Sequence, residues 1–190
     1  GSITNTGTNA GATTCTACGA GKYSTASNVS ACTDCDAGQY AATTGSAKAS
    51  DCEVCDAGSI TNSGSVAGAS ACTACAAGTY SSRSDIDACT SCGAGRYAPA
   101  SGLTSCSACA AGKKQAAEGM AFCDACEAGK YQASANATSC IACGTGTYAD
   151  GGSSSCKSCP AGYSSSTSDA AKCNACDAGK HRAKMGQSFC

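Results

Sequence analysis

Twenty-one cysteines are the residues of this chain whose type and spacing point to chemistry. They form ten Cys-x-x-Cys pairs and one final cysteine, and the pairs begin at intervals of 16, 17 or 20 residues. The pairs begin at Cys15, Cys32, Cys52, Cys72, Cys89, Cys106, Cys123, Cys140, Cys156 and Cys173, and Cys190 stands alone. A motif that recurs at a nearly fixed interval indicates a tandem array, in which each repeat contacts mainly its neighbours.

Three kinds of cysteine chemistry come close to this spacing. Paired Cys-x-x-Cys motifs separated by 12 to 16 residues fall near zinc-ribbon spacing. Zinc knuckles usually place a glycine directly after the second cysteine, whereas here the glycine follows three residues later. A thioredoxin-like redox site needs one active Cys-x-x-Cys on a βαβ core, which a repeated motif does not provide. We therefore expect disulfides, with no metal-ligating residue, no cofactor-binding residue and no cofactor.

The chain has too few large apolar residues to form a globular core. The chain has one Leu, three Val, four Ile, two Phe and no Trp among its 190 residues. Ordering each residue costs on the order of 1–2 kcal/mol of backbone entropy, which so little apolar surface does not offset. Closing a loop of about 15 residues with a disulfide contributes ~3 kcal/mol. Covalent cross-links must therefore hold the fold, and such scaffolds form in oxidising compartments, so we expect an extracellular or cell-surface protein of the secretory pathway.

The repeat reads Cys-x-x-Cys-x-Ala-Gly-x-Tyr, followed by about eight small polar residues. A glycine three residues after the second cysteine predicts a turn with positive φ or a close approach of neighbouring backbone. Two residues later comes a position that we call the tyrosine slot, whose ring we expect to cover the adjacent disulfide. The slot holds Tyr23, Tyr40, Ile60, Tyr80, Tyr97, Lys114, Tyr131, Tyr148 and His181, and Tyr163 arrives one position early.

These features predict a small disulfide-rich repeat array: an elongated, solenoid-like rod of short β pieces and loops, with essentially no helix and no globular core. Residues 1–190 form one continuous array of about ten and a half repeats, which we expect to be part of a longer chain. The repeats lie near residues 1–17, 18–34, 35–54, 55–74, 75–91, 92–108, 109–125, 126–142, 143–158, 159–175 and 176–190. The two spacings of 20 predict three inserted residues between the tyrosine slot and the next cysteine.

Sequence spacing leaves the disulfide connectivity open. Each Cys-x-x-Cys could close on itself, bonds could skip repeats, or the second cysteine of each pair could join the first of the next. The last scheme, which we call the ladder, uses twenty cysteines and leaves Cys15 unpaired. Its bonds are Cys18–Cys32, Cys35–Cys52, Cys55–Cys72, Cys75–Cys89, Cys92–Cys106, Cys109–Cys123, Cys126–Cys140, Cys143–Cys156, Cys159–Cys173 and Cys176–Cys190.

The repeat resembles known extracellular modules. The segments from Cys35 through Gly38 and Tyr40 to Cys52, and from Cys126 to Cys140, resemble the single-disulfide module of tumour necrosis factor receptor cysteine-rich domains. They are also similar to ephrin-receptor-like cysteine-rich repeats and to Cys-x-x-Cys arrays of protist surface antigens. In the receptor module the cysteine before Gly-x-Tyr bonds to the next cysteine, so the resemblance implies the ladder.

Two sequons predict N-glycosylation, at Asn28 and Asn136. No catalytic constellation is visible, and the one histidine, His181, fills a tyrosine slot, where packing is its expected role. We therefore expect no catalytic residue and no enzymatic activity. Glu127 with Lys130, and Asp177 with Lys180, share repeats and could form local ion pairs.

The net charge of −1 argues against a nucleic-acid partner. Residues 1–71 carry two basic and five acidic residues, whereas residues 89–190 carry nine basic and six acidic ones, which suggests head-to-tail or staggered contact between copies. We predict a structural function as a coat, stalk or fibre subunit that binds copies of itself, is glycosylated, and meets a membrane only through segments outside this chain. The alternative is a receptor or adhesin ectodomain, whose best candidate loop is residues 120–122.

Overall fold

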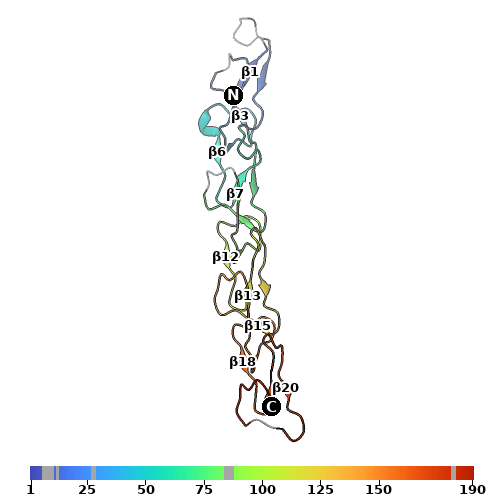
Figure 1. Ribbon diagram of the computed structural model, residues 1–190. Coiled ribbons are helices and arrows are strands. Elements are labelled where there is room, and N and C mark those ends of the chain that lie inside the picture. Colours follow the sequence, from blue (N-terminus) through green and yellow to red (C-terminus); the bar gives the residue numbers. More distant parts are fainter. Residues whose placement is uncertain (6–10, 12, 27–28, 84–87, 181–182) are drawn as a thin grey trace. The chain divides into compact units, whose positions relative to one another are not determined.

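The computed structural model describes residues 1–5, 11, 13–26, 29–83, 88–180 and 183–190. Two compact units divide the chain. Unit 1 comprises residues 1–90 and 100–105, and unit 2 comprises residues 91–99 and 106–190. Within each unit, short strand pairs follow one another and are joined by loops (Figure 1).

In the described ranges, twenty strands of two or three residues form ten two-stranded sheets. Each sheet pairs two successive strands: β1–β2, β3–β4, β5–β6, β7–β8, β9–β10, β11–β12, β13–β14, β15–β16, β17–β18 and β19–β20. The strands are β1 Ser2–Thr4, β2 Cys15–Ala17, β3 Lys22–Tyr23, β4 Thr33–Asp34, β5 Gln39–Tyr40, β6 Glu53–Val54, β7 Ser59–Thr61, β8 Cys72–Ala74, β9 Thr79–Tyr80, β10 Thr90–Ser91, β11 Arg96–Tyr97, β12 Ser107–Ala108, β13 Lys113–Lys114, β14 Asp124–Ala125, β15 Lys130–Tyr131, β16 Ile141–Ala142, β17 Thr147–Tyr148, β18 Lys157–Ser158, β19 Tyr163–Ser164 and β20 Asn174–Ala175. Among the described residues the one helical element is the 3₁₀ turn η1, Ala49–Asp51.

Every hairpin uses the same two parts of the repeat. The first strand begins directly after the repeat glycine, and the second contains the two residues between the paired cysteines. In β13 and β14, for example, Lys113 lies opposite Ala125 and Lys114 opposite Asp124, in antiparallel register. Two-stranded pieces of this size are not stable alone, so the adjacent disulfides and the stacking between repeats must hold them.

The two longer repeats accommodate their extra residues differently. In the repeat that ends at Cys52, η1 takes up the insertion immediately before the cysteine. In the next repeat the hairpin is longer, because Ser59–Thr61 pairs with Cys72–Ala74 and the amide of Asn62 donates to Ala71 at 2.9 Å. Both insertions lie where the sequence predicts them, between the tyrosine slot and the next cysteine.

Backbone hydrogen bonds connect successive repeats within each unit. In unit 2 the carbonyl of Gly112 accepts from the amide of Cys126 at 2.9 Å, and the amide of Gly112 donates to Gln132 at 2.7 Å. The amide of Gln132 in turn donates to the carbonyl of Ser153 at 3.1 Å. The same pattern occurs in unit 1, with distances of 2.8 to 3.1 Å. There the carbonyl of Gly58 accepts from the amide of Cys75, the amide of Gly58 donates to Ser81, and the amide of Ser81 donates to Leu103. Each repeat is therefore hydrogen-bonded to the repeat that follows it.

The interior of each unit consists of cysteine sulfur and small side chains. The second cysteine of nine pairs, from Cys18 to Cys159, is at most 1% exposed. Two further positions are buried in most repeats: the repeat glycine, and the residue directly after the tyrosine slot, which is Ser24, Ala41, Thr61, Ser81, Ala98, Gln115, Gln132, Ala149 or Ser165. The predicted fold class, a disulfide-rich repeat array of small paired strands without a helical core, is confirmed.

Candidate functional site

Ten disulfides join the second cysteine of each pair to the first cysteine of the next. They are Cys18–Cys32, Cys35–Cys52, Cys55–Cys72, Cys75–Cys89, Cys92–Cys106, Cys109–Cys123, Cys126–Cys140, Cys143–Cys156, Cys159–Cys173 and Cys176–Cys190. Their Cα–Cα separations lie between 5.5 and 5.8 Å, which is ordinary for a disulfide. The two cysteines of each bond are 13 to 17 residues apart, and each bond closes the loop of one repeat.

The remaining cysteine chemistry is limited. Across the described part of the chain, Cys15 is the one free cysteine, and it is exposed. Within the same residues no group of three or more His, Cys, Asp or Glu side chains is placed to hold a metal ion. With their sulfur atoms in disulfides, the paired cysteines do not form the tetrathiolate sites that the zinc alternative requires.

The repeat glycine has the predicted backbone conformation. Gly112 has φ +80°, and a Cβ atom there would overlap the carbonyl oxygen of Gly152. The same contact joins Gly95 to Asn136 and Gly129 to Asp169. Glycine is therefore required twice over at this position, by its left-handed backbone and by the close approach of a later repeat.

A second left-handed position recurs four residues before a first cysteine. Its amide donates to the carbonyl of an earlier second cysteine, as Gly152 does to Cys126 at 2.8 Å. Glycine usually fills it, but Asn136 with φ +61° and Asp169 with φ +55° are exceptions. Asparagine and aspartate are the side chains that tolerate this conformation best, which explains both exceptions.

The tyrosine slot lies half-buried over the disulfides. Tyr23 packs against the cluster of Cys35, Ala41 and Cys52, and so covers the disulfide of the next repeat as predicted. The backbone of Tyr23 also bridges to Ser46 in parallel sense. Tyr163, which comes one position early, is 43% exposed.

Buried polar side chains after the tyrosine slot close the loop of their own repeat. Gln132 is 9% exposed, its Nε2 donates to the carbonyl of Ser139 at 2.8 Å, and its Oε1 accepts from the amide of Ser134 at 3.0 Å. Gln115 makes the same bonds to Phe122 and Ala117 at 2.9 and 3.0 Å. Within the described residues, no buried side-chain nitrogen or oxygen lacks a partner.

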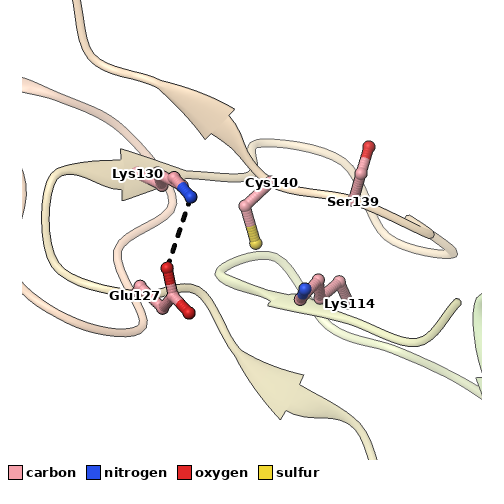
Figure 2. A pocket seen from close by; sticks show the side chains of 5 residues that line it. All are labelled: Lys114, Glu127, Lys130, Ser139 and Cys140. Carbon is pink, nitrogen blue, oxygen red and sulfur yellow. Dashed lines mark hydrogen bonds and ion pairs between the residues drawn. The ribbon is translucent and has the colours of Figure 1, made fainter. Parts of the chain in front are cut away.

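Unit 2 has a recurring shallow groove beside its disulfides. One groove is lined by Lys114, Glu127, Lys130, Ser139 and Cys140 (Figure 2). A second, of about 130 Å³, is lined by the equivalent residues of the preceding repeat, Tyr97, Ala110, Lys113, Phe122 and Cys123. A third, near residues 177–190, uses the same repeat positions. The repeat therefore provides one groove geometry and varies the side chains that line it.

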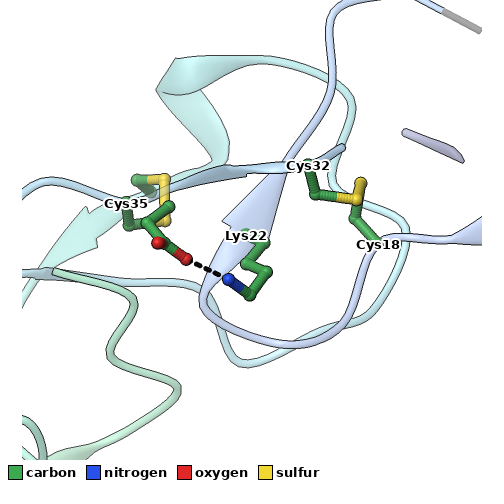
Figure 3. Close-up of polar contacts among 6 residues, drawn as sticks. Cys18, Lys22, Cys32 and Cys35 are labelled. Carbon is green, nitrogen blue, oxygen red and sulfur yellow. Dashed lines mark hydrogen bonds and ion pairs between the residues drawn. A yellow bond between two sulfur atoms is a disulfide. The ribbon is translucent and has the colours of Figure 1, made fainter. Parts of the chain in front are cut away.

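Exposed ion pairs lie along the hairpins. Lys130 Nζ is 3.3 Å from Glu127 Oε2, which confirms the local pair expected from the sequence. Lys22 pairs with Asp34 between two disulfides (Figure 3). Among the described residues no ion pair forms between Asp177 and Lys180, although both line the third groove. Exposed pairs of this kind contribute about 0.2–1 kcal/mol each.

Lys157 has a perturbed protonation equilibrium. Its Nζ donates to Asp150 Oδ2 at 2.7 Å, and it lies 5.8 Å from the centroid of the Tyr148 ring. The hydrogen bond to Asp150, the Asp150 charge and the charge of ionised Tyr148 raise the pKa of Lys157 above its ordinary value of 10.5. Lys157 is therefore fully cationic at physiological pH.

The predicted glycosylation sites are placed unequally. The Asn136 side chain is exposed, and its backbone is fixed by the 2.9 Å bond from its amide to Cys109. Asn28 and His181 lie outside the described residues. The structure therefore describes the environment of the Asn136 sequon alone.

The two compact units carry opposite charge. Unit 1 has three basic and seven acidic residues, a net charge of −4. Unit 2 has nine basic and six acidic residues, a net charge of +3. The net charges of the two units therefore differ by more than the net charges of residues 1–71 and 89–190 do.

Across the residues that the structure describes, no helix has the length and apolar character needed to cross a bilayer.

Comparison with known proteins identifies the type of repeat. A family model described as tyrosine-protein kinase ephrin type A/B receptor-like matches residues 78–121 and residues 112–151. No curated protein matches the chain. The two tandem matches and the ladder of ten disulfides confirm the resemblance to ephrin-receptor-like cysteine-rich repeats. The chain thus carries extracellular, disulfide-rich modules similar to a receptor-like family, which is not an enzyme family.

Proposed function

We propose that the chain is an extracellular structural protein, a disulfide-laddered subunit of a cell-surface coat, stalk or fibre. The observation that carries the proposal is the recurrence of one backbone bonding pattern, from Gly58 in unit 1 to Gly146 in unit 2. Identical bonding in successive repeats favours mechanical continuity over a single specialised site. The proposed role is non-catalytic.

Self-association is the second part of the proposal. Units with net charges of −4 and +3 attract each other when they belong to different copies, and copies staggered by one unit would bring them together. The attraction between exposed charges is screened beyond about 10 Å at 0.1 M salt. Association of this kind should therefore weaken steeply as the ionic strength rises.

N-glycosylation is the third part. The exposed Asn136 begins the sequon that continues through Ala137 to Thr138, and disulfides such as those of this chain are typical of proteins of the secretory pathway, where N-glycosylation occurs. Its backbone amide and carbonyl face earlier repeats, whereas its side chain is exposed. A glycan at Asn136 would then extend from the surface without interrupting the stacking between repeats.

The experiment is sedimentation velocity and negative-stain electron microscopy of the purified, oxidised chain. At ~0.02 M salt, where the screening length is about 20 Å, we expect ordered assemblies of the chain alone, and at ~0.5 M salt we expect dispersal. A chain that stays monomeric at every concentration and at both salt levels would contradict the proposal.

A receptor or adhesin ectodomain is the second candidate. Two observations favour it: the match to a receptor-like family model over residues 78–151, and the groove at Tyr97 and Phe122, whose lining differs from that of its neighbours. Recovery of a soluble ligand on a monomeric chain, with no assembly, would support this candidate.

A further inference from the structure

We propose that the groove lined by Tyr97, Lys113 and Phe122 is the docking site for the acidic segment Asp51–Asp56 of a second copy. The inference rests on the proposed self-association and names its contact. The groove belongs to the positively charged unit 2, and the segment belongs to the negatively charged unit 1.

The groove contains a lysine ammonium group, that of Lys113, and no carboxylate to neutralise it. In the neighbouring groove, Glu127 follows the second cysteine and neutralises Lys130 at 3.3 Å. At the equivalent place in the Tyr97 groove stands Ala110, so no acid lines it. Among the described residues no carboxylate pairs with Lys113. Its ammonium is therefore available to an acidic group from outside the chain.

The groove also presents an exposed aromatic side chain in a fixed place. Phe122 is 56% exposed, yet its backbone carbonyl accepts a 2.9 Å hydrogen bond from the buried Gln115 side chain. The disulfide Cys109–Cys123 fixes the adjacent residue. Because the loop is already ordered, little conformational entropy is lost when a partner docks there.

The complementary surface is the segment between two disulfides of unit 1. Cys52 and Cys55 are both buried and each is fixed by its own disulfide, and the two residues between them, Glu53 and Val54, are exposed in strand β6. Val54 is 45% exposed, so it offers an aliphatic side chain beside a carboxylate. A rigid segment of this kind suits a groove with one aromatic side chain and one cation.

The carboxylates of the segment are also free of cations. Glu53 accepts a long hydrogen bond of 3.4 Å from the Tyr40 hydroxyl, and Asp56 is exposed. Within the described residues, neither forms an ion pair. Asp51 is different, because its Oδ2 accepts from the amides of Ala47 and Lys48 at 2.8 and 3.2 Å.

The proposed contact places Val54 against Phe122, with Glu53 or Asp56 at Lys113. An apolar pair at the centre and charges around it is the usual composition of a protein interface. A single contact of this size is weak, but a staggered assembly repeats it at every copy and gains by multivalency.

The first test is carbodiimide cross-linking of a mixture of isotope-labelled and unlabelled full chains. Carbodiimide condenses a carboxylate with a lysine amine, with loss of water, only where the two groups are in contact. We expect a peptide in which Lys113 of one isotope form is joined to Glu53 or Asp56 of the other. Intermolecular links that consistently avoid Lys113 would overturn the inference.

The second test is charge reversal in the full chain, measured by sedimentation equilibrium. Lys113→Glu and Glu53→Lys should each weaken association by about threefold or more, and the double variant should regain the wild-type association constant to within about twofold. Lys130→Glu is the matched control, because Lys130 is already paired with Glu127. Phe122→Ser, which copies Ser139 of the next groove, should weaken association as well.

The outcomes separate the two proposals. If the wild-type chain assembles and the Lys113 and Glu53 variants assemble equally well, the docking site is wrong while the structural function stands. If the wild-type chain does not assemble at all, both are wrong. Binding of an acidic glycan or an unrelated acidic protein that is lost in Lys113→Glu, with self-association unchanged, would assign the groove to a different occupant.

Discussion

The amide of Asn136 donates to the carbonyl of Cys109 at 2.9 Å, in a left-handed conformation that glycine adopts at the equivalent position of most repeats. The carbonyl of Asn136 in turn lies against Gly95, two repeats earlier. One residue with positive φ thereby ties three repeats together. The proposed glycosylation site and the stacking contact share this residue, but they use its side chain and its backbone separately.

Replacing Asn136 should show that its backbone conformation matters. Asn136→Ala should destabilise the local stacking by about 1 kcal/mol, because alanine tolerates the left-handed region poorly, whereas Asn136→Gly should be neutral or stabilising. Amide hydrogen exchange at position 136 measures the difference, and Thr138→Ala provides a control that removes the sequon alone. If the amide at position 136 is equally protected from exchange in the Ala and Gly variants, the left-handed φ of this residue does not determine the local stability.

Substituting the repeat glycine should be far more damaging. Gly112→Ala adds a Cβ that overlaps the carbonyl of Gly152, and it strains a residue with φ +80°, so we expect a loss of about 2 kcal/mol or more. Gly93→Ala is the matched control, since a Cβ at Gly93 meets no atom within 4 Å. Exchange of the Cys126 and Gly112 amides, whose bonds depend on this contact, should accelerate in the first variant only. Similar exchange in both variants would refute the close-approach argument.

Removing a buried loop-closing side chain should loosen one repeat. Gln132→Ala deletes the bonds to Ser139 and Ser134 and leaves their backbone groups without these partners, at a cost of about 1–3 kcal/mol. The measurement is susceptibility of residues 132–139 to limited proteolysis, compared with the intact loop from Gln115 to Phe122 in the same molecule. If both loops stay equally resistant, the side chain is not what orders the loop.

The Lys157 ammonium should titrate at an unusually high pH. Its pKa is raised above 10.5, chiefly by the hydrogen bond to Asp150. The stabilisation is therefore fully present below pH 10.5 and is lost as the pH rises through the raised pKa. Asp150→Asn should lower the pKa of Lys157 toward its ordinary value in an NMR titration. Asp124→Asn removes the same charge elsewhere, and a shift of equal size in that variant would exclude a direct pairing effect.

The local features of the fold could be predicted from the sequence because they depend on short spacings. The left-handed backbone of Gly112, the strands at the cysteine pairs and the insertion before Cys52 follow from the repeat pattern. The packing of Tyr23 on the next disulfide follows from its fixed place after the glycine.

Other features could not be predicted, for physical reasons. Gln132 is a buried polar residue, which an analysis of apolar periodicity interprets as loop. The second left-handed position has one sequence signal, a Gly, Asn or Asp four residues before a cysteine, as at Gly152. The contact of Gly112 with Gly152 spans more than two repeats, and local spacing does not indicate which repeats stack.

The disulfides are the main source of order in this fold, and the decisive measurement is amide hydrogen exchange before and after complete reduction and alkylation. The amides of Cys126 and Cys143, which donate to Gly112 and Gly129 at 2.9 Å, should be protected in the oxidised chain. After reduction they should exchange at the rate of an unfolded peptide, because the few apolar side chains do not offset the chain entropy. Protection that survives reduction would contradict the account.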